Sequence, residues 1–383
     1  MQPLNIVVIG AGIAGLTLAK GLQKQGIPCH ILEKDSHALA RRQGFRIRLN
    51  ASGQAALAAC LPVADFDQVV SEVALSQERM CLFDGQLRPV KQRIMAWQGD
   101  AEPVAFQPPE WKVDRSMLRA TLLRGLESHI AFSSPYRAMH PQPDGRWAVH
   151  AGNRTLLADV VVVADGAHSD VAAQLGLHTE REREYACIYA RCWSASPAWH
   201  RFYADDLSVI RADGLTMIID AMTFSSNIDR AGYLYWAIFA RHAHPLMTRA
   251  RHQPQRVGGV AAQWAAEANW HGDLQALLAA QEGQASVVDV VQLARPIVGP
   301  AGVVFMGDAA HLMSPASGLG ANTALYDAHC LTELFALVQQ GRLSLRTALD
   351  AYTDRMSTHA SCCLWQSLNG SRELTLESSH SVE

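Results

Sequence analysis

Residues 4–34 read LNIVVIGAGIAGLTLAKGLQKQGIPCHILEK, and this stretch decides the fold. Four apolar residues, Ile6 to Ile9, predict a short buried strand, and the apolar residues that recur at helical spacing after the turn predict a helix. A second strand, Pro28–Leu32, is expected to end at the acidic Glu33. Strand, glycine-rich turn, helix, strand and terminal acid together form the βαβ fingerprint of a dinucleotide-binding unit.

The glycines and the acid each have a separate role in such a unit. Gly10 permits the tight turn, Gly12 lets the backbone approach a pyrophosphate, and Gly15 lets the helix pack closely on the strand. The helix N-terminus faces the phosphates, and Glu33 can accept hydrogen bonds from a ribose. The acid disfavours the alternative of a glycine turn that binds nothing. The lysine that follows the acid can lie over the adenine side of the site. The expected site therefore also includes Ala11, Ile13, Ala14 and Lys34.

The bulk composition excludes several classes of protein. With 383 residues the chain should form two domains or two closely packed lobes. A net charge of −3 and the absence of a Lys/Arg block argue against a nucleic-acid binder. Eight cysteines without a CxxC pair predict reduced thiols and no metal site. We expect a cytoplasmic protein without a signal peptide, because a strand begins by Leu4, and without a membrane span.

Two further apolar strands end in small and acidic residues, at Asp165-Gly166 and at Gly307-Asp308. The carboxyl ends of parallel strands form the ligand crevice of an open sheet, so we expect both pairs beside the glycine turn. Between these motifs, residues 130–163 and 181–245 suggest antiparallel sheet. Helices are expected over Ala51–Leu61, Val113–His129, His252–Gln281, Asn322–Gln340, Leu343–Arg355 and a last segment to about Leu376.

Three motifs carry a family resemblance. The first is Gly10–Gly15 with Glu33, the second is VVVADGAHS at 161–169, and the third is GDAAHLMSPASGLGAN at 307–322. In the same order they resemble the motifs of FAD-dependent aromatic-hydroxylase-type monooxygenases, the class A, para-hydroxybenzoate hydroxylase-like flavoproteins. The tetracycline-inactivating and salicylate-hydroxylase-like branches look most similar. Smaller matches are GFRIRL at 44–49 and VDRSML at 113–118.

The resemblance implies an α/β fold: a Rossmann-like FAD-binding domain of the GR2 type, with an inserted, mostly antiparallel substrate domain and C-terminal helices. The implied division has six segments. They are 1–71, 100–180 and 291–341 for the FAD-binding domain, 72–99 and 181–290 for the substrate domain, and 342–383 for the C-terminal helices and tail.

The resemblance also assigns cofactor contacts. Asp308 would bind the FAD ribitol, and the helix beginning near Gly320 would stabilise negative charge on the reduced flavin, with Gly318 allowing close approach. Arg115 would contact FAD, with Arg119 as the fallback and a surface salt bridge as the alternative. The remaining expected cofactor contacts lie in the second and third motifs: Asp165, Gly166, Pro315, Leu319, Ala321 and Asn322.

Two residues are candidates for a catalytic role. Arg48 shares a strand face with Arg46 and faces either the flavin, an anionic substrate or solvent. His311 invites a general-base role, but the chemistry of the family does not require one, so a structural histidine is favoured.

The substrate pocket is expected between the flavin ring and the sheet of residues 181–245. Aromatic, apolar and basic residues alternate there, which suits a planar or polycyclic organic substrate, although the sequence does not choose which face of the sheet lines the pocket. The candidates are Arg191, Trp193, Phe202, Arg211, Met217, Phe224 and Tyr235.

The resemblance implies a monooxygenase in which NAD(P)H, a transient co-substrate, reduces FAD. A flavin C4a-hydroperoxide would then transfer one atom of O₂ to an aromatic or polycyclic small molecule, most simply by hydroxylation. One position departs from the family: Ala172 stands where the second motif usually has arginine, which bears on the reduction step. Other FAD-linked oxidoreductases, such as an oxidase, a dehydrogenase or a halogenase, and a non-catalytic FAD-binding module remain alternatives. A monomer or a homodimer is expected.

Overall fold

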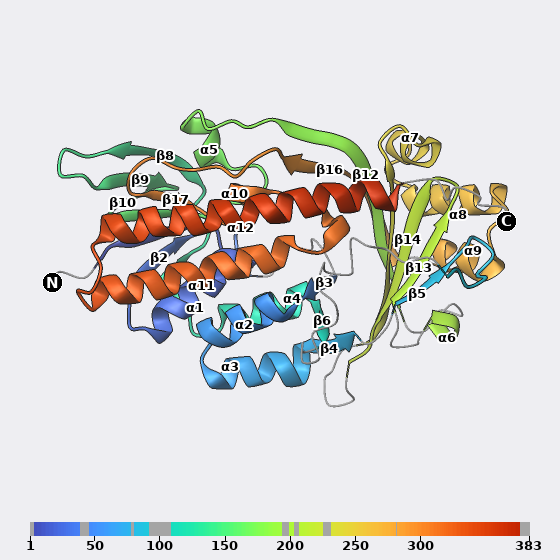
Figure 1. Ribbon diagram of the computed structural model, residues 1–383, viewed down its shortest axis with the longest axis horizontal. Coiled ribbons are helices and arrows are strands. Elements are labelled where there is room, and N and C mark those ends of the chain that lie inside the picture. The colour runs from blue at the N-terminus through green and yellow to red at the C-terminus, as the bar shows by residue number, and fades with distance from the viewer. Residues whose placement is uncertain are drawn as a thin grey trace.

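A five-stranded parallel sheet forms around the first strand of the fingerprint (Figure 1). The computed structural model describes residues 4–38, 46–77, 80–91, 109–193, 199–202, 207–224, 231–280 and 282–375. The strand order is β17 (Val303–Phe305), β11 (Val160–Val163), β1 (Ile6–Ile9), β2 (Cys29–Leu32) and β7 (Ile130–Ala131). Strands β1, β11 and β17 are buried throughout, as expected for a parallel sheet covered on both faces.

Helices α1 (Ile13–Lys24) and α11 (Gly320–Gln339) pack together beside this sheet. An antiparallel meander shares the same hydrophobic core through Met139, Trp147 and Val149. Its strands are β8 (Tyr136–Pro141), β9 (Trp147–Ala151) and β10 (Arg154–Ala158). The short helix α5 (Asp170–Gln174) follows β11.

A six-stranded sheet forms the other half of the molecule. The order is β16 (Glu282–Leu293), β12 (Arg181–Trp193), β15 (Tyr233–Arg241), β14 (Leu215–Met222), β13 (Leu207–Ala212) and β5 (Met80–Phe83). Every pairing is antiparallel except β13 with β5. One face packs against α7 (Pro245–His252), α8 (Val257–Glu267) and α9 (Gly272–Ala279), and the short α6 (Trp199–Phe202) contacts β14 and β15. The opposite face is therefore the one that can meet the parallel-sheet half.

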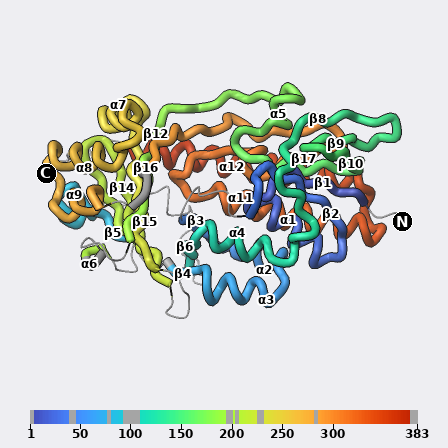
Figure 2. Tube along the Cα trace, turned by 180° about the vertical axis from the view of Figure 1, so that it is seen from behind, coloured from blue at the N-terminus to red at the C-terminus, as the bar shows by residue number. Residues whose placement is uncertain are grey.

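A small third sheet lies between the two halves (Figure 2). It consists of β3 (Arg46–Leu49), β6 (Glu110–Asp114) and β4 (Ala74–Gln77), all antiparallel. The helical segments around it are α2 (Ala51–Cys60), α3 (Val63–Gln68), a π-helical turn (Val69–Val73) and α4 (Arg115–Leu123). Lys112 of β6 and Asp220 of β14 form an ion pair of 3.1 Å between this sheet and the six-stranded one, with side chains 1% and 0% exposed.

The longest helix, α12 (Leu345–Leu374), has 30 residues and runs from beside the parallel sheet to the six-stranded sheet (Figures 1 and 2). Among the described residues, no helix is long and apolar enough to cross a membrane.

Four expected helices differ from those observed. The helix expected over Val113–His129 begins at Arg115, because the two residues before it pair with β3, and it ends at Leu123. The segment His252–Gln281 holds separate helices, and the two helices expected after residue 342 are the single α12. Two of the expected segments lie partly outside the described part of the chain: Gly44 and Phe45 of the GFRIRL match, and residues 376–383 of the expected C-terminal segment.

Candidate active site

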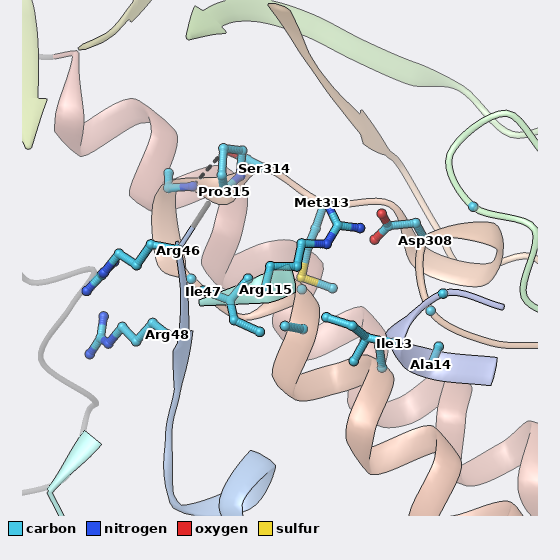
Figure 3. A pocket seen from close by; sticks show the side chains of 18 of the residues that line it. Ile13, Ala14, Arg46, Ile47, Arg48, Arg115, Asp308, Met313, Ser314 and Pro315 are labelled. Carbon is cyan, nitrogen blue, oxygen red and sulfur yellow. Dashed lines mark hydrogen bonds between the residues drawn. The ribbon is translucent and has the colours of Figure 1, made fainter. Parts of the chain in front are cut away.

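A cavity of about 380 Å³ lies between the carboxyl ends of the parallel strands and the inner face of the six-stranded sheet (Figure 3). Its size falls within the range of about 300–1,000 Å³ typical of ligand pockets. It brings together residues from all three motifs of the sequence. The expected cofactor residues that line it are Gly10, Gly12, Ile13, Ala14, Glu33, Arg48, Arg115, Asp165, Gly166, Asp308, Pro315, Gly318, Gly320 and Ala321.

The glycine turn has the geometry that a pyrophosphate needs. Gly10 has φ +108°, and a Cβ there would lie 2.3 Å from the carbonyl oxygen of Ala164. A Cβ on Gly15 would lie 2.2 Å from the carbonyl oxygen of Gly10, so only glycine permits this packing of helix on turn. A Cβ on Gly12, by contrast, would meet nothing within 4 Å, and this residue opens on the cavity. The N-terminus of α1 has no side-chain cap, so its N–H groups are available to an anion.

Glu33 lines the cavity but is only 1% exposed. Its carboxylate accepts hydrogen bonds from the N–H of Ala11 at 2.8 Å and from that of Asp35 at 2.9 Å. The acid therefore braces the glycine turn in addition to facing the place where a ribose would lie. Lys34 is exposed and lies outside the cavity lining.

Asp308 and Arg115 face the middle of the cavity from opposite elements, and their side chains point toward each other (Figure 3). Gly307, with φ +59°, turns the chain from β17 into the helix that Asp308 begins. Within the described part of the chain neither charged group makes an ion pair or a side-chain hydrogen bond. A carboxylate and a guanidinium held open in this way suit the hydroxyl and phosphate groups of a dinucleotide.

Asp165 lines the same region, and its Oδ1 is buried without a hydrogen-bond partner. Burial raises the pKa of this carboxyl, opposed by hydrogen bonds from Ser169 and from the N–H of Val171. An unpartnered buried oxygen is unusual in a protein and fits a site that a polar ligand completes.

The turn before α11 closes the other end of the cavity, where Pro315, Gly318 and Gly320 line the wall. Helix α11 begins at Gly320 without a side-chain cap. Its N-terminus therefore presents N–H groups and a partial positive charge, which suits a cofactor ring that becomes negative when reduced. The donors, the open glycines and the orphaned carboxylate oxygen together fit FAD.

Asn322 and Leu319 shape this turn without lining the cavity. The Asn322 amide donates to the carbonyls of Arg48 (3.0 Å) and Gly318 (2.9 Å) and accepts from the N–H of Asn50 (3.0 Å). It joins β3 to the turn. Leu319 packs beside Met313 and Leu364.

Arg46 and Arg48 extend to the same side of β3, as the alternation predicts (Figure 3). Arg48 lines the cavity near Gly318 and forms an ion pair with Glu110. Arg46 also lines the cavity, and it forms an ion pair with Asp220. Arg119 donates to the backbone carbonyls of Ala11 and Ala38, so it supports the glycine turn.

His311 lies behind the cavity wall and is 0% exposed. Its Nε2 lies 2.6 Å from Oδ2 of Asp327, which also accepts the N–H of Gly307 at 3.0 Å. Burial disfavours the charged imidazole, but the Asp327 charge and hydrogen bond outweigh it and raise the pKa of His311. Because the ring does not reach the cavity, this placement supports a structural role over a general base.

Of the expected substrate residues, Tyr235 lines the cavity. Met217 points the other way, into the core beneath α7–α9, because its neighbours Thr216 and Ile218 occupy the cavity face of β14. Phe202 lies in the same core. Arg211 reaches the end of α12, donating to the carbonyl of Glu373 at 2.9 Å.

The remaining expected substrate residues form an aromatic cluster outside the cavity lining. The Arg191 guanidinium lies 4.3 Å from the centroid of the Trp193 ring, and Trp193 packs edge-on against Tyr233. Phe224 packs against the same tyrosine, at 6.2 Å between ring centroids.

Sequence reasoning missed several lining residues, and six of them lie on the cavity face of the six-stranded sheet. Strand alternation around Tyr235 would have found those of β15, since residues two apart share a face. The missed residues are Arg46, Ile47, Ala164, Cys187, Leu207, Thr216, Ile218, Ala237, Phe239, Met306, Met313, Ser314, Ala316, Ala324 and Leu374.

Comparison with known proteins agrees with this geometry. A family model described as "FAD binding domain" matches residues 101–366, more than half of the chain. The chain belongs to this FAD-binding family. A second model, the NAD(P)-binding Rossmann-like domain, matches residues 8–50, which contain the glycine turn. Among the described residues, no group of three or more His, Cys, Asp or Glu side chains could hold a metal ion.

Two curated relatives of the FAD-binding chain show how far the similarity extends. The dual O-methyltransferase/FAD-dependent monooxygenase CTB3 of Cercospora beticola is 27% identical over 96% of this chain and 46% of its own length. The chain thus spans about half the length of the first such relatives. The 3-demethoxyubiquinol 3-hydroxylase of Escherichia coli is 23% identical over 87% of this chain and 80% of its own.

Solved structures share the fold of this FAD-binding chain. HpxO of Klebsiella pneumoniae, complexed with FAD and uric acid, aligns with a TM-score of 0.78 over 98% of this chain and 90% of that one, at 18% identity. The 2,6-dihydroxypyridine-3-hydroxylase of Arthrobacter nicotinovorans gives 0.76 over 99% and 96%, at 17% identity. The expected fold, a Rossmann-like FAD-binding domain with an antiparallel sheet and C-terminal helices, is confirmed.

Proposed function

We propose that this chain is an FAD-dependent monooxygenase that uses NAD(P)H and O₂ to hydroxylate an aromatic or polycyclic small molecule. The observation that carries the proposal is the continuity of one cavity. It runs from the glycine turn, past Asp308 and Arg115, to the inner face of the six-stranded sheet. A cofactor held at one end would therefore present its reactive end to whatever binds against the sheet.

Residues of the chain divide the binding of FAD among them. The N-terminus of α1 and Arg115 would neutralise the diphosphate, Asp308 would accept hydrogen bonds from the ribitol, and the N-terminus of α11 would stabilise negative charge on the ring. Bound FAD would supply the redox chemistry, which takes a hydride from NAD(P)H and delivers one atom of O₂ to the substrate while the other leaves as water. The protein contributes position and a partly closed, largely apolar space.

The substrate end of the cavity supports a flat organic molecule. Leu207, Ile218, Tyr235 and Phe239 supply apolar and aromatic surface there. Burial raises the pKa of Tyr235, so its hydroxyl stays protonated and can donate a hydrogen bond. Apolar side chains outnumber polar ones on this part of the sheet. Such pockets select a ligand by its shape and by one or two hydrogen bonds that fix its orientation.

NAD(P)H is proposed to dock transiently near Asp165 and α5. At the position of the motif arginine, Ala172 is 5% exposed and donates its N–H to the hydroxyl of Ser169 at 3.0 Å. This hydrogen bond caps the N-terminus of α5, and it forms although the motif arginine is absent. We therefore propose that residues other than the one at position 172 orient the nicotinamide. The cytoplasm is the proposed compartment, in keeping with eight free thiols. A monomer or a homodimer is proposed as the functional form.

Spectroscopy and isotope labelling test the proposal. The purified protein should be yellow and should bleach anaerobically when NADPH or NADH is added. A panel of phenols, hydroxypyridines and polycyclic phenols should contain compounds that stimulate NAD(P)H consumption. Their products should gain one ¹⁸O atom from ¹⁸O₂. Product labelled from H₂¹⁸O instead, or a flavin that neither nicotinamide reduces, would refute the monooxygenase.

A further inference from the structure

A buried network of hydroxyl groups joins the last turns of α12 to the turn that precedes α11. The hydroxyl of Ser371 lies 2.6 Å from that of Ser314, and the hydroxyl of Ser367 lies 2.6 Å from that of Ser317. These four side chains are between 0% and 5% exposed. Ser367 and Ser371, one helical turn apart on α12, thus contact the two serines of the turn before α11.

Gln292, near the end of β16, ties the six-stranded sheet into the same network. Its side-chain carbonyl accepts the N–H of Ser314 at 3.2 Å, and its amide donates to the carbonyl of Leu364 at 2.8 Å. The Ser314 hydroxyl also accepts the N–H of Ala316 at 3.2 Å (Figure 3). The turn therefore has little freedom to shift along α12 without breaking several buried hydrogen bonds at once.

The turn held in this way is a wall of the cavity. Ser314, Pro315, Ala316 and Gly318 line it, at the end away from the glycine turn (Figure 3). The serines of α12 do not line it, so they act on the cavity only through this turn.

The C-terminal end of α12 reaches the substrate side as well. Leu374 lines the cavity, and its carbonyl accepts the hydroxyl of Thr216 at 2.6 Å. Thr216 lines the cavity from β14. The last two turns of one helix thus contact the cofactor-facing turn and the substrate-facing sheet together.

We propose that Ser367 and Ser371 are positioning residues, which fix the Ser314–Gly318 turn against the ring end of FAD at a set spacing from the six-stranded sheet. The inference rests on the FAD site proposed above. An apolar contact between helix and turn would allow small slides, because dispersion is not directional. The two hydroxyl pairs favour one register, since a slide leaves Ser367 and Ser317 without each other and leaves Ser371 only its bond to the carbonyl of Ser367, 3.1 Å away in the same helix.

The test compares two ligands that occupy different lengths of the cavity. Bound FAD would reach both ends, whereas ADP would occupy only the glycine-turn half. In Ser367→Ala/Ser371→Ala the dissociation constant for FAD should rise about tenfold, as expected for one or two lost buried hydrogen bonds. The dissociation constant for ADP should stay within about twofold, since the glycine turn is untouched. The visible circular dichroism of bound FAD should also change.

Two further variants make the result decisive. Ser361→Ala removes an exposed hydroxyl of α12 that donates to the carbonyl of Ser357 at 2.7 Å, and it should leave both dissociation constants and the spectrum unchanged. Ser317→Ala breaks the network from the turn and leaves α12 intact. It should reproduce the selective loss of FAD affinity even if the double variant folds poorly.

An equal loss of FAD and ADP affinity in Ser317→Ala would show a merely structural role, and an unchanged FAD affinity would show no role; either result overturns the proposal. None of these measurements uses oxygen, NAD(P)H or a substrate. A protein that shows the selective loss but never oxygenates a compound would therefore contradict the proposed function and leave this inference in place.

Discussion

At the scale of single residues, Asp308 is the carboxylate that we expect to bind the ribitol of FAD. It faces the cavity opposite Arg115 and makes no hydrogen bond within the described part of the chain. If it binds the ribitol, Asp308→Ala should raise the dissociation constant for FAD by about tenfold to a hundredfold, the value of one or two hydrogen bonds to a charged group. Fluorescence titration of the apoprotein measures this. The exposed Asp350→Ala is the matched control, and equal effects of the two variants would contradict the assignment.

His311 gives the stability of the protein a defined dependence on pH. Its pKa in the folded state is raised above the ordinary value of 6.5, so the imidazolium is favoured by folding. The corresponding stabilisation is complete below pH 6.5 and is lost as the pH rises through the higher folded pKa. The difference in unfolding free energy between the wild type and His311→Asn should therefore shrink with rising pH. Urea unfolding at a series of pH values measures it, and a difference that grows toward alkaline pH would contradict the His311–Asp327 pairing.

At the scale of elements, the end of α12 depends on the hairpin of β13 and β14. Arg211 is 8% exposed, and it donates to the carbonyl of Glu373 in the last helical turn, whose carbonyls lack the N–H donors of a following turn. Arg211→Met keeps the apolar stem and removes the donor. It should lower the unfolding free energy by about 1.5–3 kcal/mol, the value of a charged hydrogen bond. It should also speed amide exchange in residues 371–375.

The comparison for that variant is Arg346→Met in the first turn of the same helix, where the side chain is 93% exposed. This second substitution should change the unfolding free energy by less than about 0.5 kcal/mol, as is usual for surface positions. Denaturant unfolding and hydrogen exchange of both variants decide the matter. Faster exchange at residues 371–375 in Arg346→Met as well would mean that the hairpin contact does not hold the helix end.

Elements with their own local signals could be predicted from the sequence. The glycine turn, Glu33 and the two later strand ends carry a pattern that only one topology satisfies, and the structure brings them to one cavity. The continuity of α12 was also readable, because no proline and only Gly370 interrupts it. The expected break near Arg355 had no physical cause.

What the sequence could not supply depends on contacts between distant segments. Met217 and Thr216 are both compatible with a pocket, and only the packing of α7–α9 on one face decides which residue points into the cavity. The serines of α12 look like ordinary small polar helix residues until Ser314 and Ser317 are placed beside them. No local sequence pattern predicts the orientation of Thr216 or the serine pairs, because each depends on contacts between segments far apart in the chain.

At the scale of the whole molecule, a buried ion pair links the small sheet to the six-stranded one. Asp220 is 0% exposed and pairs with Lys112 and with Arg46, which is itself almost buried. Removing one partner leaves an uncompensated buried charge, so Asp220→Asn should lower the unfolding free energy by about 3–5 kcal/mol. The apolar replacement Arg46→Met/Lys112→Met/Asp220→Leu removes both cations together with the anion and should recover more than half of that loss. Urea unfolding of the wild type and the two variants measures this, and a triple variant as unstable as the single one would contradict the charge argument.

The order of the strands has a consequence for any attempt to divide this protein. The parallel sheet draws its strands from residues 6–9, 29–32, 130–131, 160–163 and 303–305, and the six-stranded sheet takes residues 80–83, 181–193, 207–222, 233–241 and 282–293. The chain therefore passes back and forth between the halves, and no contiguous fragment contains one complete sheet alone. Early in synthesis the first βαβ unit lacks β11, the strand that pairs with β1 on its open side, because β11 emerges from the ribosome much later and the edge strand β17 later still. Until then the apolar faces of β1 must be shielded by the growing chain or by a chaperone.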